Sequence, residues 1–246
     1  MEWRVEHLEQ VGSTNTWLKD RALEGAPEGL VVYADVQSAG RGRLDRQWES
    51  AAGSSLLCSM LVRPTLPRDR LQLVVAAVAL SARAAVADLS GVQPDLKWPN
   101  DLVVNDDKLA GLLAEVVSTD RGLAVVVGVG INLTQHPVDT HATDVREVSG
   151  VALQPRSLLD TLLERLTPRC AQLERDEGRV EMTRDYSGAL ATLGRRVRVL
   201  GRDGEQVGRA LRVDASGHLV VKVDGVEMTF SAGDVVHVRT DTSDDQ

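Results

Sequence analysis

Hydrophobic and polar positions alternate along this chain with two periods, which separate predicted helices from predicted strands. Apolar residues recur at helical spacing over residues 17–23, 70–89, 157–177 and 179–193. Ser13 or Thr14 stands where the first of these helices needs an N-cap, and Gly25 and Gly91 stand where the first two should end. Pro168 is expected either to kink the third helix or to start a second one there.

β-rich runs lie between these helices, and turn residues separate most of them. They cover residues 5–11, 30–36, 55–62, 96–98, 102–104, 109–117 and 123–133. The first run is short and mixed, as expected of an edge strand. The last four are joined by short connections such as Asn105-Asp106-Asp107, which favour antiparallel hairpins because parallel strands need long crossovers. We therefore predict an α+β fold with a mixed, largely antiparallel sheet packed by helices.

The pattern changes at Leu193-Gly194, where short β-type runs replace the helices. They cover residues 197–200, 206–213, 218–223 and 226–230, with glycine-containing turns between them. This pattern is typical of a small β-barrel. We expect a main domain over residues 1–193 and a β-barrel domain over residues 194–240, followed by a disordered acidic tail over residues 241–246.

Composition narrows the class of protein. The 28 Lys and Arg residues against 36 Asp and Glu residues give a net charge of -8, which argues against a protein that coats nucleic acid. Two cysteines are too few for a disulfide scaffold or a zinc site, so a reducing cytoplasm is the expected location. The charge-free stretch over residues 71–82 is short of the roughly 20 residues that cross a bilayer, and it predicts a buried helix.

The loop after residue 36 is the first candidate site. It has no core-forming periodicity, and its Gly40-Arg41-Gly42-Arg43 run combines backbone freedom with two guanidinium groups that can clamp a carboxylate or a phosphate. Trp48 follows closely. Taken alone, the run fits a solvated, flexible loop equally well.

Two further candidate sites follow along the chain, a lysine-containing pair of segments and a glycine-containing strand. Lys97-Trp98-Pro99-Asn100-Asp101 precedes Lys108-Leu109-Ala110-Gly111, and Lys108 can face a pocket, although composition alone favours a surface lysine there and a core role for Trp98. The Gly128-Val129-Gly130-Ile131-Asn132-Leu133 segment lacks the third glycine, the helix and the downstream acid of a dinucleotide-binding fingerprint. Its glycines indicate instead the close approach of a flat ligand.

Taken in order, these segments resemble the biotin protein ligases. The resemblance is carried by Ser13-Thr14-Asn15, by residues 37–43 with Trp48, by Lys97-Trp98-Pro99-Asn100-Asp101-Leu102, by Lys108-Leu109-Ala110-Gly111 and by Gly128-Val129-Gly130-Ile131-Asn132. The β-rich end also resembles the SH3-like C-terminal domain of these ligases. The resemblance implies a biotin ligase-like fold of the class II aminoacyl-tRNA synthetase type.

The resemblance also implies an activity in two steps. Biotin and ATP, with Mg²⁺, give biotinyl-5′-AMP and pyrophosphate, and a lysine of a biotin carboxyl carrier protein of an acyl-CoA carboxylase then displaces AMP. By similarity, Ser13, Thr14 and Gln37 hydrogen-bond the ureido ring of biotin with Asn15 close by, while the strand at residues 128–130 admits the bicycle.

The expected charge-handling residues follow from the same resemblance. Arg41 and Arg43 close over the carboxylate and the α-phosphate, Lys108 bridges biotin and phosphate oxygens, and Trp48 stacks on adenine. Lys108, Arg43 and Asp101 are the expected catalytic residues. Asn100 and Asp101 position the adenylate and Mg²⁺, whose ligands stay open, and Asp101 is also expected to receive the proton of the incoming lysine. The remaining expected binding residues are Gly40, Gly42, Gly111, Gly128, Gly130 and Asn132.

Two alternatives stay open. A lipoate ligase or octanoyltransferase resembles this family in fold, but the Gly-Arg-Gly-Arg loop and the Lys-Trp-Pro-Asn-Asp segment favour biotin. A non-catalytic, DNA-binding sensor of biotinyl-AMP is the second; the ligase-like core begins within the first dozen residues, so no DNA binding is expected. We also expect no membrane association and a monomer or weak homodimer. The histidines show no ligand spacing, and Cys58 is expected to be a small core residue.

Overall fold

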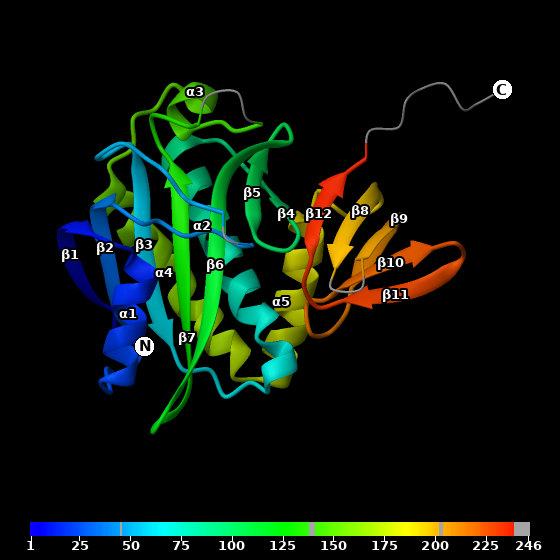
Figure 1. The fold of residues 1–246 in the computed structure, drawn as a ribbon, viewed down its shortest axis with the longest axis horizontal. Coiled ribbons are helices and arrows are strands. Elements are labelled where there is room, and N and C mark those ends of the chain that lie inside the picture. Colours follow the sequence, from blue (N-terminus) through cyan, green and yellow to red (C-terminus); the bar gives the residue numbers. More distant parts are fainter. Residues whose placement is uncertain (45, 138–140, 202–203, 239–246) are drawn as a thin grey trace.

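Two sheets organise the chain in the computed structural model, which describes residues 1–44, 46–137, 141–201 and 204–238. The larger sheet has seven strands in the order β1-β2-β3-β7-β6-β5-β4 (Figure 1). These strands are β1 Arg4–Val11, β2 Leu30–Gln37, β3 Ser55–Val62, β4 Asp95–Lys97, β5 Asp101–Val104, β6 Asp107–Thr119 and β7 Gly122–Asn132. Only β1 and β2 pair in parallel, so the predicted mixed, largely antiparallel sheet is confirmed, with its first strand at an edge.

Helices cover both faces of this sheet. They are α1 Thr14–Leu23, α2 Gln72–Ser90, α3 Val145–Ser149, α4 Pro155–Leu173 and α5 Asp176–Ala189, with a 3-10 turn over Arg68–Arg70. α1 packs alone on one face, where Leu18 and Ala22 are buried against Val126 of β7. α2 and α4 lie behind the opposite face, over the main apolar core (Figure 1). This arrangement leaves the first turn of α1 beside the middle of the sheet.

The helix boundaries show what the sequence pattern captured and what it missed. α2 ends at Gly91, whose φ of 74° is the left-handed conformation predicted for that stop. No helix begins at Pro168: α4 continues past it to Leu173, and the next helix begins at Asp176 rather than Arg179 and ends at Ala189 rather than Leu193. The expectation of a helix start at Pro168 is therefore wrong. The leucines of α4 stay buried on both sides of the proline, and this burial outweighs the roughly 3 kcal/mol cost of an interior proline.

α2 is a core helix. Together with the preceding turn, residues 68–90 are long and apolar enough to cross a membrane by length and composition, with a mean hydropathy of 1.7. Most of the segment is buried in the fold, however, between the sheet and α4. The prediction of a buried helix for residues 71–82 is therefore confirmed.

The C-terminal segment forms a separate antiparallel sheet of five strands. They are β8 Arg196–Gly201, β9 Gly204–Val213, β10 Leu219–Val223, β11 Val226–Phe230 and β12 Asp234–His237. The predicted short strands after residue 193 are confirmed as β8 to β11, although the pattern missed β12 and, in the main domain, α3. The expected disorder of residues 241–246 concerns a segment outside the described residues.

Trp98 connects the two sheets through hydrogen bonds. Its side chain is buried, as the core interpretation expects, and its Nε1 donates a hydrogen bond to the Gly217 carbonyl oxygen in the turn before β10, at 3.1 Å. Its backbone N–H donates to Thr192 Oγ1 at 3.0 Å. The small domain therefore lies beside the turn between β4 and β5. Asn100 lies in this turn, and β5 begins at Asp101.

Candidate functional site

One cavity gathers most of the residues that the sequence singled out. It lies where β6, β7 and the first turn of α1 meet the loop after β2, with Asp234 of β12 at its rim, and it measures about 800 Å³ including its open mouth. Segments far apart in the chain contribute the predicted residues that line it: Ser13, Thr14, Asn15, Gln37, Arg41, Gly42, Arg43, Trp48, Asn100, Asp101, Lys108, Gly111, Gly128 and Gly130.

The first turn of α1 forms one end of the cavity. Ser13 occupies the N-cap position with extended backbone, but its hydroxyl makes no capping hydrogen bond. Thr14 donates to Gln37 Oε1 from its backbone N–H at 2.7 Å and from its hydroxyl at 3.0 Å. These bonds hold the Gln37 amide by its oxygen. Within the described residues, the Ser13 hydroxyl and the Gln37 Nε2 have no hydrogen-bond partner and are available to a ligand.

Asn15 lies across three adjacent strands. Ser59 of β3, Gly128 of β7 and Leu113 of β6 stand side by side in register. Asn15 Oδ1 accepts from the Ser59 hydroxyl at 2.6 Å, and its Nδ2 donates to the Leu113 carbonyl oxygen at 3.1 Å. A Cβ on Gly128 would lie 2.3 Å from Asn15 Oδ1, so only glycine permits this position of the amide.

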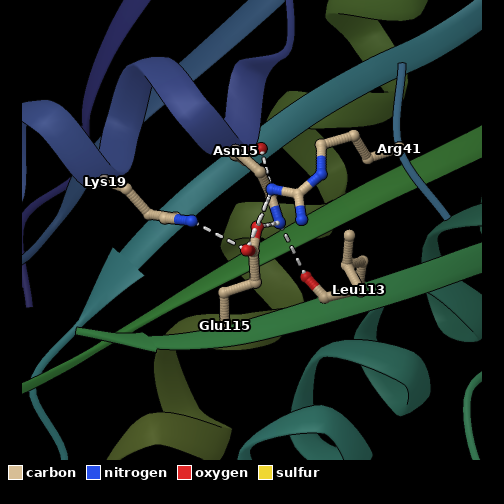
Figure 2. Close-up of polar contacts among 6 residues, drawn as sticks. Asn15, Lys19, Arg41, Leu113 and Glu115 are labelled. Atoms are coloured by element: carbon tan, nitrogen blue, oxygen red, sulfur yellow. Dashed lines mark hydrogen bonds and ion pairs between the residues drawn. The ribbon is translucent and has the colours of Figure 1, made fainter. Parts of the chain in front are cut away.

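Glu115 of β6 connects this end of the cavity to the loop after β2 that carries Arg41, Arg43 and Arg46, which we call the arginine loop (Figure 2). Its carboxylate accepts from Asn15 Nδ2 at 3.0 Å, from Lys19 Nζ at 2.8 Å and from Arg41 Nη1 at 3.0 Å. Burial alone would raise the pKa of Glu115, but these hydrogen bonds and the two positive charges together lower it below its ordinary value. The side chain is therefore ionised at neutral pH and serves as a common acceptor for three donors.

The arginine loop is held at its other end by the small domain. Arg43 Nη1 donates to Asn100 Oδ1 at 3.0 Å, and its Nη2 donates to the Gly233 carbonyl oxygen at 3.1 Å. Arg46 pairs with Asp234 at the start of β12. Burial is the main cause of the lowered pKa of Arg43. The loop therefore closes one wall of the cavity through contacts with both domains.

Lys108 lines the cavity, with 37% of its side chain exposed. The β5–β6 hairpin turns at Asn105 and Asp106, which both have positive φ, and this turn brings Lys108 back beside Asp101. Lys108 Nζ lies 2.7 Å from Asp101 Oδ1 and 5.8 Å from the centroid of the Trp48 ring. Lys108 is thus a partly exposed hairpin lysine, and the Asp101 carboxylate holds its ammonium at the cavity.

Trp48 lies flat against two glycines. Gly111 and Gly130 are paired across β6 and β7, and a Cβ on Gly130 would lie 2.5 Å from Trp48 Cε2. A Cβ on Gly111 would lie 3.1 Å from Trp48 Cζ3 and 3.1 Å from Lys108 Nζ. The glycines in these strands therefore make room for Asn15 and Trp48, the side chains that form the cavity walls.

Two of the expected binding residues do not line the cavity. Gly40 shapes the loop: its carbonyl oxygen accepts from the Trp48 N–H at 3.0 Å, and a Cβ there would lie 2.2 Å from the Trp48 carbonyl oxygen. Asn132 is buried at the end of β7, and its Nδ2 donates to the Thr143 carbonyl oxygen at 3.0 Å. Gly40 therefore shapes the backbone beside Trp48, and Asn132 lines a neighbouring hollow together with Trp48 and Lys108.

Sequence reasoning missed several residues of this site, namely Lys19, Ser59, Glu115 and Asp234. One signal was available for Glu115. Alternate residues of a strand share a face, so Gly111, Leu113 and Glu115 of β6 point to the same side of the sheet. A carboxylate on the same face as a predicted site residue is a candidate. Asp234 had no such signal, because it comes to the cavity only through the packing of the two domains.

The remaining candidates stay outside the cavity's chemistry or are ordinary core. Burial raises the pKa of the Cys58 thiol to about 12, as expected for a small core residue. His136 lies 3.0 Å from Glu147 Oε2 and 3.9 Å from Asp144 Oδ2, a proximity that spacing in the sequence does not reveal. These carboxylates already have structural roles, since Asp144 caps α3 and Glu147 accepts from the Thr143 hydroxyl.

Comparisons with known proteins identify the family of the chain. Residues 8–132 match the model of the biotin/lipoate A/B protein ligase family, and residues 192–238 match that of the biotin protein ligase C-terminal domain. The chain is 38% identical to the biotin–[acetyl-CoA-carboxylase] ligase of Mycobacterium tuberculosis, over 96% of this chain and 90% of that protein. It is 32% identical to the ligase of the same name from Paracoccus denitrificans, over 93% and 98% of the two chains. The fold is similar to a structure described as the biotin protein ligase of Aquifex aeolicus in complex with biotin and ATP, with a TM-score of 0.83, 26% identity and coverage of 96% and 99%.

Proposed function

The chain belongs to the biotin/lipoate A/B protein ligase family, and from this premise we propose that it activates biotin with ATP and transfers it to a lysine of a carrier protein. The observation that carries the proposal is the convergence of Arg41, Arg43 and Lys108 on one cavity whose far end holds polar groups suited to a ureido ring. A carboxylate and a triphosphate repel each other. Fixed cations between them lower the cost of contact and stabilise the charge that develops during transfer.

Biotin binds with its ureido ring at the first turn of α1. The ureido carbonyl needs hydrogen-bond donors. The Ser13 hydroxyl makes no capping hydrogen bond to the helix, and Thr14 engages only the oxygen of the Gln37 amide, so the Ser13 hydroxyl and the Gln37 Nε2 are available. Cys58 and Val129 supply apolar surface in the same cavity for the rings. A lipoyl or octanoyl group has no ureido ring and would leave these polar groups unpaired, which favours biotin over lipoate.

The first step joins the biotin carboxylate to the α-phosphorus of ATP. A carboxylate oxygen attacks phosphorus, the bond from phosphorus to the bridging oxygen of pyrophosphate breaks, and pyrophosphate leaves. Arg41 and Arg43 come from the loop that closes the cavity, and Lys108 faces them from the β5–β6 hairpin. Together they neutralise the carboxylate and the phosphate oxygens, while Trp48 offers its ring face to adenine.

The second step transfers the biotinyl group. The amine of the carrier lysine attacks the acyl carbon, the bond from that carbon to the AMP oxygen breaks, and an amide forms as the amine loses a proton. Asp101 is the carboxylate beside Lys108 and first holds that ammonium in place. Its carboxylate lines the cavity, and we assign it to receive the proton. The relatives' names support a biotin carrier of an acyl-CoA carboxylase as the acceptor.

Asp101 is also the residue that fits Mg²⁺. Magnesium sites in nucleotide enzymes commonly use one or two carboxylates together with substrate phosphates. Asp101 supplies one carboxylate at the cavity wall, with one oxygen beside Lys108, whereas both the oxygen and the nitrogen of the Asn100 amide are hydrogen-bonded to Arg43 and to the Leu112 carbonyl oxygen. Mg²⁺ held there would neutralise phosphate charge when ATP is bound.

The net charge of -8 supports a role that involves no DNA.

One experiment tests the function directly. The chain is incubated with biotin, ATP, Mg²⁺ and a biotin carboxyl carrier domain, and the carrier is weighed by mass spectrometry. We expect the mass gain of one biotinyl group, no gain without ATP, and no gain on a carrier whose target lysine is replaced by arginine. Parallel reactions with lipoate and octanoate serve as the comparison, and preferential lipoylation would overturn the assignment to biotin.

A further inference from the structure

Glu115 sits between two parts of the site that must act on the same substrate. It contacts Asn15, at the end assigned to the ureido ring, and Arg41, in the loop assigned to the carboxylate (Figure 2). It comes from the middle of β6, where its backbone is paired with Val126 of β7. Its carboxylate is largely buried, with 17% of the side chain exposed.

We infer that Glu115 is a positioning residue for biotin: it fixes the Asn15 amide and presents Arg41 to the biotin carboxylate. The inference rests on the proposed function. It adds a residue that touches neither ATP nor the reacting atoms and that acts through two others.

The contacts of Asn15 define its amide orientation. Nδ2 donates to Glu115 and to the Leu113 carbonyl oxygen, so Oδ1 must face the Ser59 hydroxyl. The Ser59 hydroxyl, whose one proton goes to Asn15, also lies 2.8 Å from Thr14 Oγ1, and the backbone N–H of Thr14 donates to Gln37 Oε1. Without a carboxylate at position 115, one reason for this orientation is lost, and the amide can rotate. The packing of Asn15 against Ser59, and of Ser59 against Thr14 beside Gln37, would then loosen.

The contacts of Arg41 leave it free to bind an anion while it stays anchored. Only Nη1 reaches Glu115, at 3.0 Å from Oε1 and 3.2 Å from Oε2. Within the described part of the chain, Nη2 and Nε of Arg41 have no hydrogen-bond partner, and the side chain lines the cavity. A guanidinium held by one nitrogen loses less conformational freedom when its other nitrogens bind a carboxylate.

Lys19 keeps the Glu115 carboxylate paired with a cation when Arg41 binds a ligand. It lies on α1, outside the cavity lining, and contacts Glu115 Oε1 at 2.8 Å. When Arg41 shares its charge with a substrate anion, Lys19 still balances Glu115, which therefore does not pull Arg41 away. Two cations around one carboxylate give a local charge of +1, which favours an incoming carboxylate.

The test compares Glu115→Gln with Glu115→Asp and with Glu227→Gln. Glu227 also pairs with an arginine, Arg212, but lies on β11 away from the cavity, so its variant controls for the loss of an ion pair. Biotin binding is measured by calorimetry, and steady-state adenylation gives the KM for biotin and for ATP. Glu115→Gln should weaken biotin binding and raise its KM on the order of tenfold, while the KM for ATP changes by less than about twofold. Glu115→Asp keeps the charge and should recover part of the loss, and Glu227→Gln should match the wild type.

The outcomes separate this inference from the proposed function. A biotin affinity of Glu115→Gln within about twofold of the wild type would overturn the inference. Equal losses for biotin and ATP together with a lower Tm would also overturn it, since they would assign Glu115 to fold support alone. A wild-type chain that binds biotin but forms no biotinyl-AMP contradicts the proposed function and leaves the comparison of biotin affinities to decide on Glu115.

Discussion

The ammonium of Lys108 and the carboxylate of Asp101 meet at 2.7 Å across the β5–β6 hairpin. The pairing determines where Lys108 points before any substrate binds. Lys108 Nζ also lies 5.8 Å from the centre of the Trp48 ring, so it stands between a carboxylate and the surface assigned to adenine. A cation oriented in advance stabilises developing negative charge without reorganising during the reaction.

Replacing Lys108 by alanine should therefore impair the chemical step. We expect Lys108→Ala to lose about 2–4 kcal/mol of transition-state stabilisation, or roughly 30- to 1000-fold in the rate of adenylation. Pyrophosphate release at saturating biotin and ATP measures this rate. Lys222→Ala is the matched control, because Lys222 is exposed on β10. A Lys108→Ala rate within a few-fold of the wild type would remove Lys108 from the mechanism.

Trp48 should matter for ATP and not for biotin. Trp48→Ala is expected to raise the Kd for ATP on the order of tenfold, from the loss of ring stacking, and to leave biotin binding unchanged. Gly130→Ala should also weaken ATP binding, because the new Cβ would lie 2.5 Å from the Trp48 ring and displace it. Calorimetric titration with each ligand measures both.

The control for this pair is Gly188→Ala. Gly188 lies in α5 with open space around its Cβ position, so alanine is tolerated there. Equal weakening of ATP and biotin binding by Trp48→Ala would instead assign Trp48 to packing.

The arginine loop should be protected by the reaction intermediate. In the structure Arg43 and Arg46 already contact Asn100, Gly233 and Asp234, but like-charged arginines without an anion gain little from closing further. We expect trypsin to cut the free enzyme within residues 41–46 and biotinyl-AMP to slow this cleavage at least about tenfold, by ordering the loop. Cleavage at Arg212, outside the cavity, provides the internal reference. Loop cleavage that is equally fast with and without the ligand would contradict the prediction.

The sequence predicts the sheet and most helices because their signals are local. The β3 run, for example, is predicted over residues 55–62 and observed over Ser55–Val62, and Gly91 ends α2 as expected. The path of the chain around Pro168 was not predictable in this way. Whether a helix passes through a proline depends on what its flanking leucines bury, which is a property of the tertiary structure.

The residues of the site also divide into those that a local sequence signal predicts and those that only the tertiary structure reveals. Short runs of glycine and arginine indicated which loop and which strands form the site. The resemblance to the biotin protein ligases, carried by these segments in the same order, assigned them to one site. Partners brought together by packing had no local signal: the contact of Arg43 with Gly233 joins residues 190 positions apart, and that of Arg41 with Glu115 joins residues 74 apart. The roles assigned to Gly128 and Gly130 also needed the structure, which shows Asn15 and Trp48 against them.

His237 should make the stability of the chain depend on pH below neutrality. Its Nδ1 lies 3.1 Å from Arg195 Nη1, its Nε2 lies 3.3 Å from Thr192 Oγ1, and Asp106 Oδ1 lies 3.5 Å from Nδ1. Burial lowers the pKa of His237 below 6.5, and the charges of Lys97 and Arg195 lower it further, against the opposing effect of Asp106. A neutral imidazole can accept from Arg195 and donate to Thr192, whereas a protonated one would direct an N–H at the guanidinium.

The sign of the effect follows from this lowered pKa. As the pH falls below about 6.5, the unfolded chain binds a proton at His237 before the folded chain does, so the free energy of unfolding decreases. The decrease ends once the pH passes the lowered pKa of the folded state. Urea denaturation between pH 7.5 and pH 4.5 should show this loss in the wild type. In His237→Gln it should be smaller by about 1.4 kcal/mol for each unit by which the pKa is lowered. The other histidines are the same in both proteins and cancel in the difference, so parallel stability profiles would show that His237 is not the titrating group.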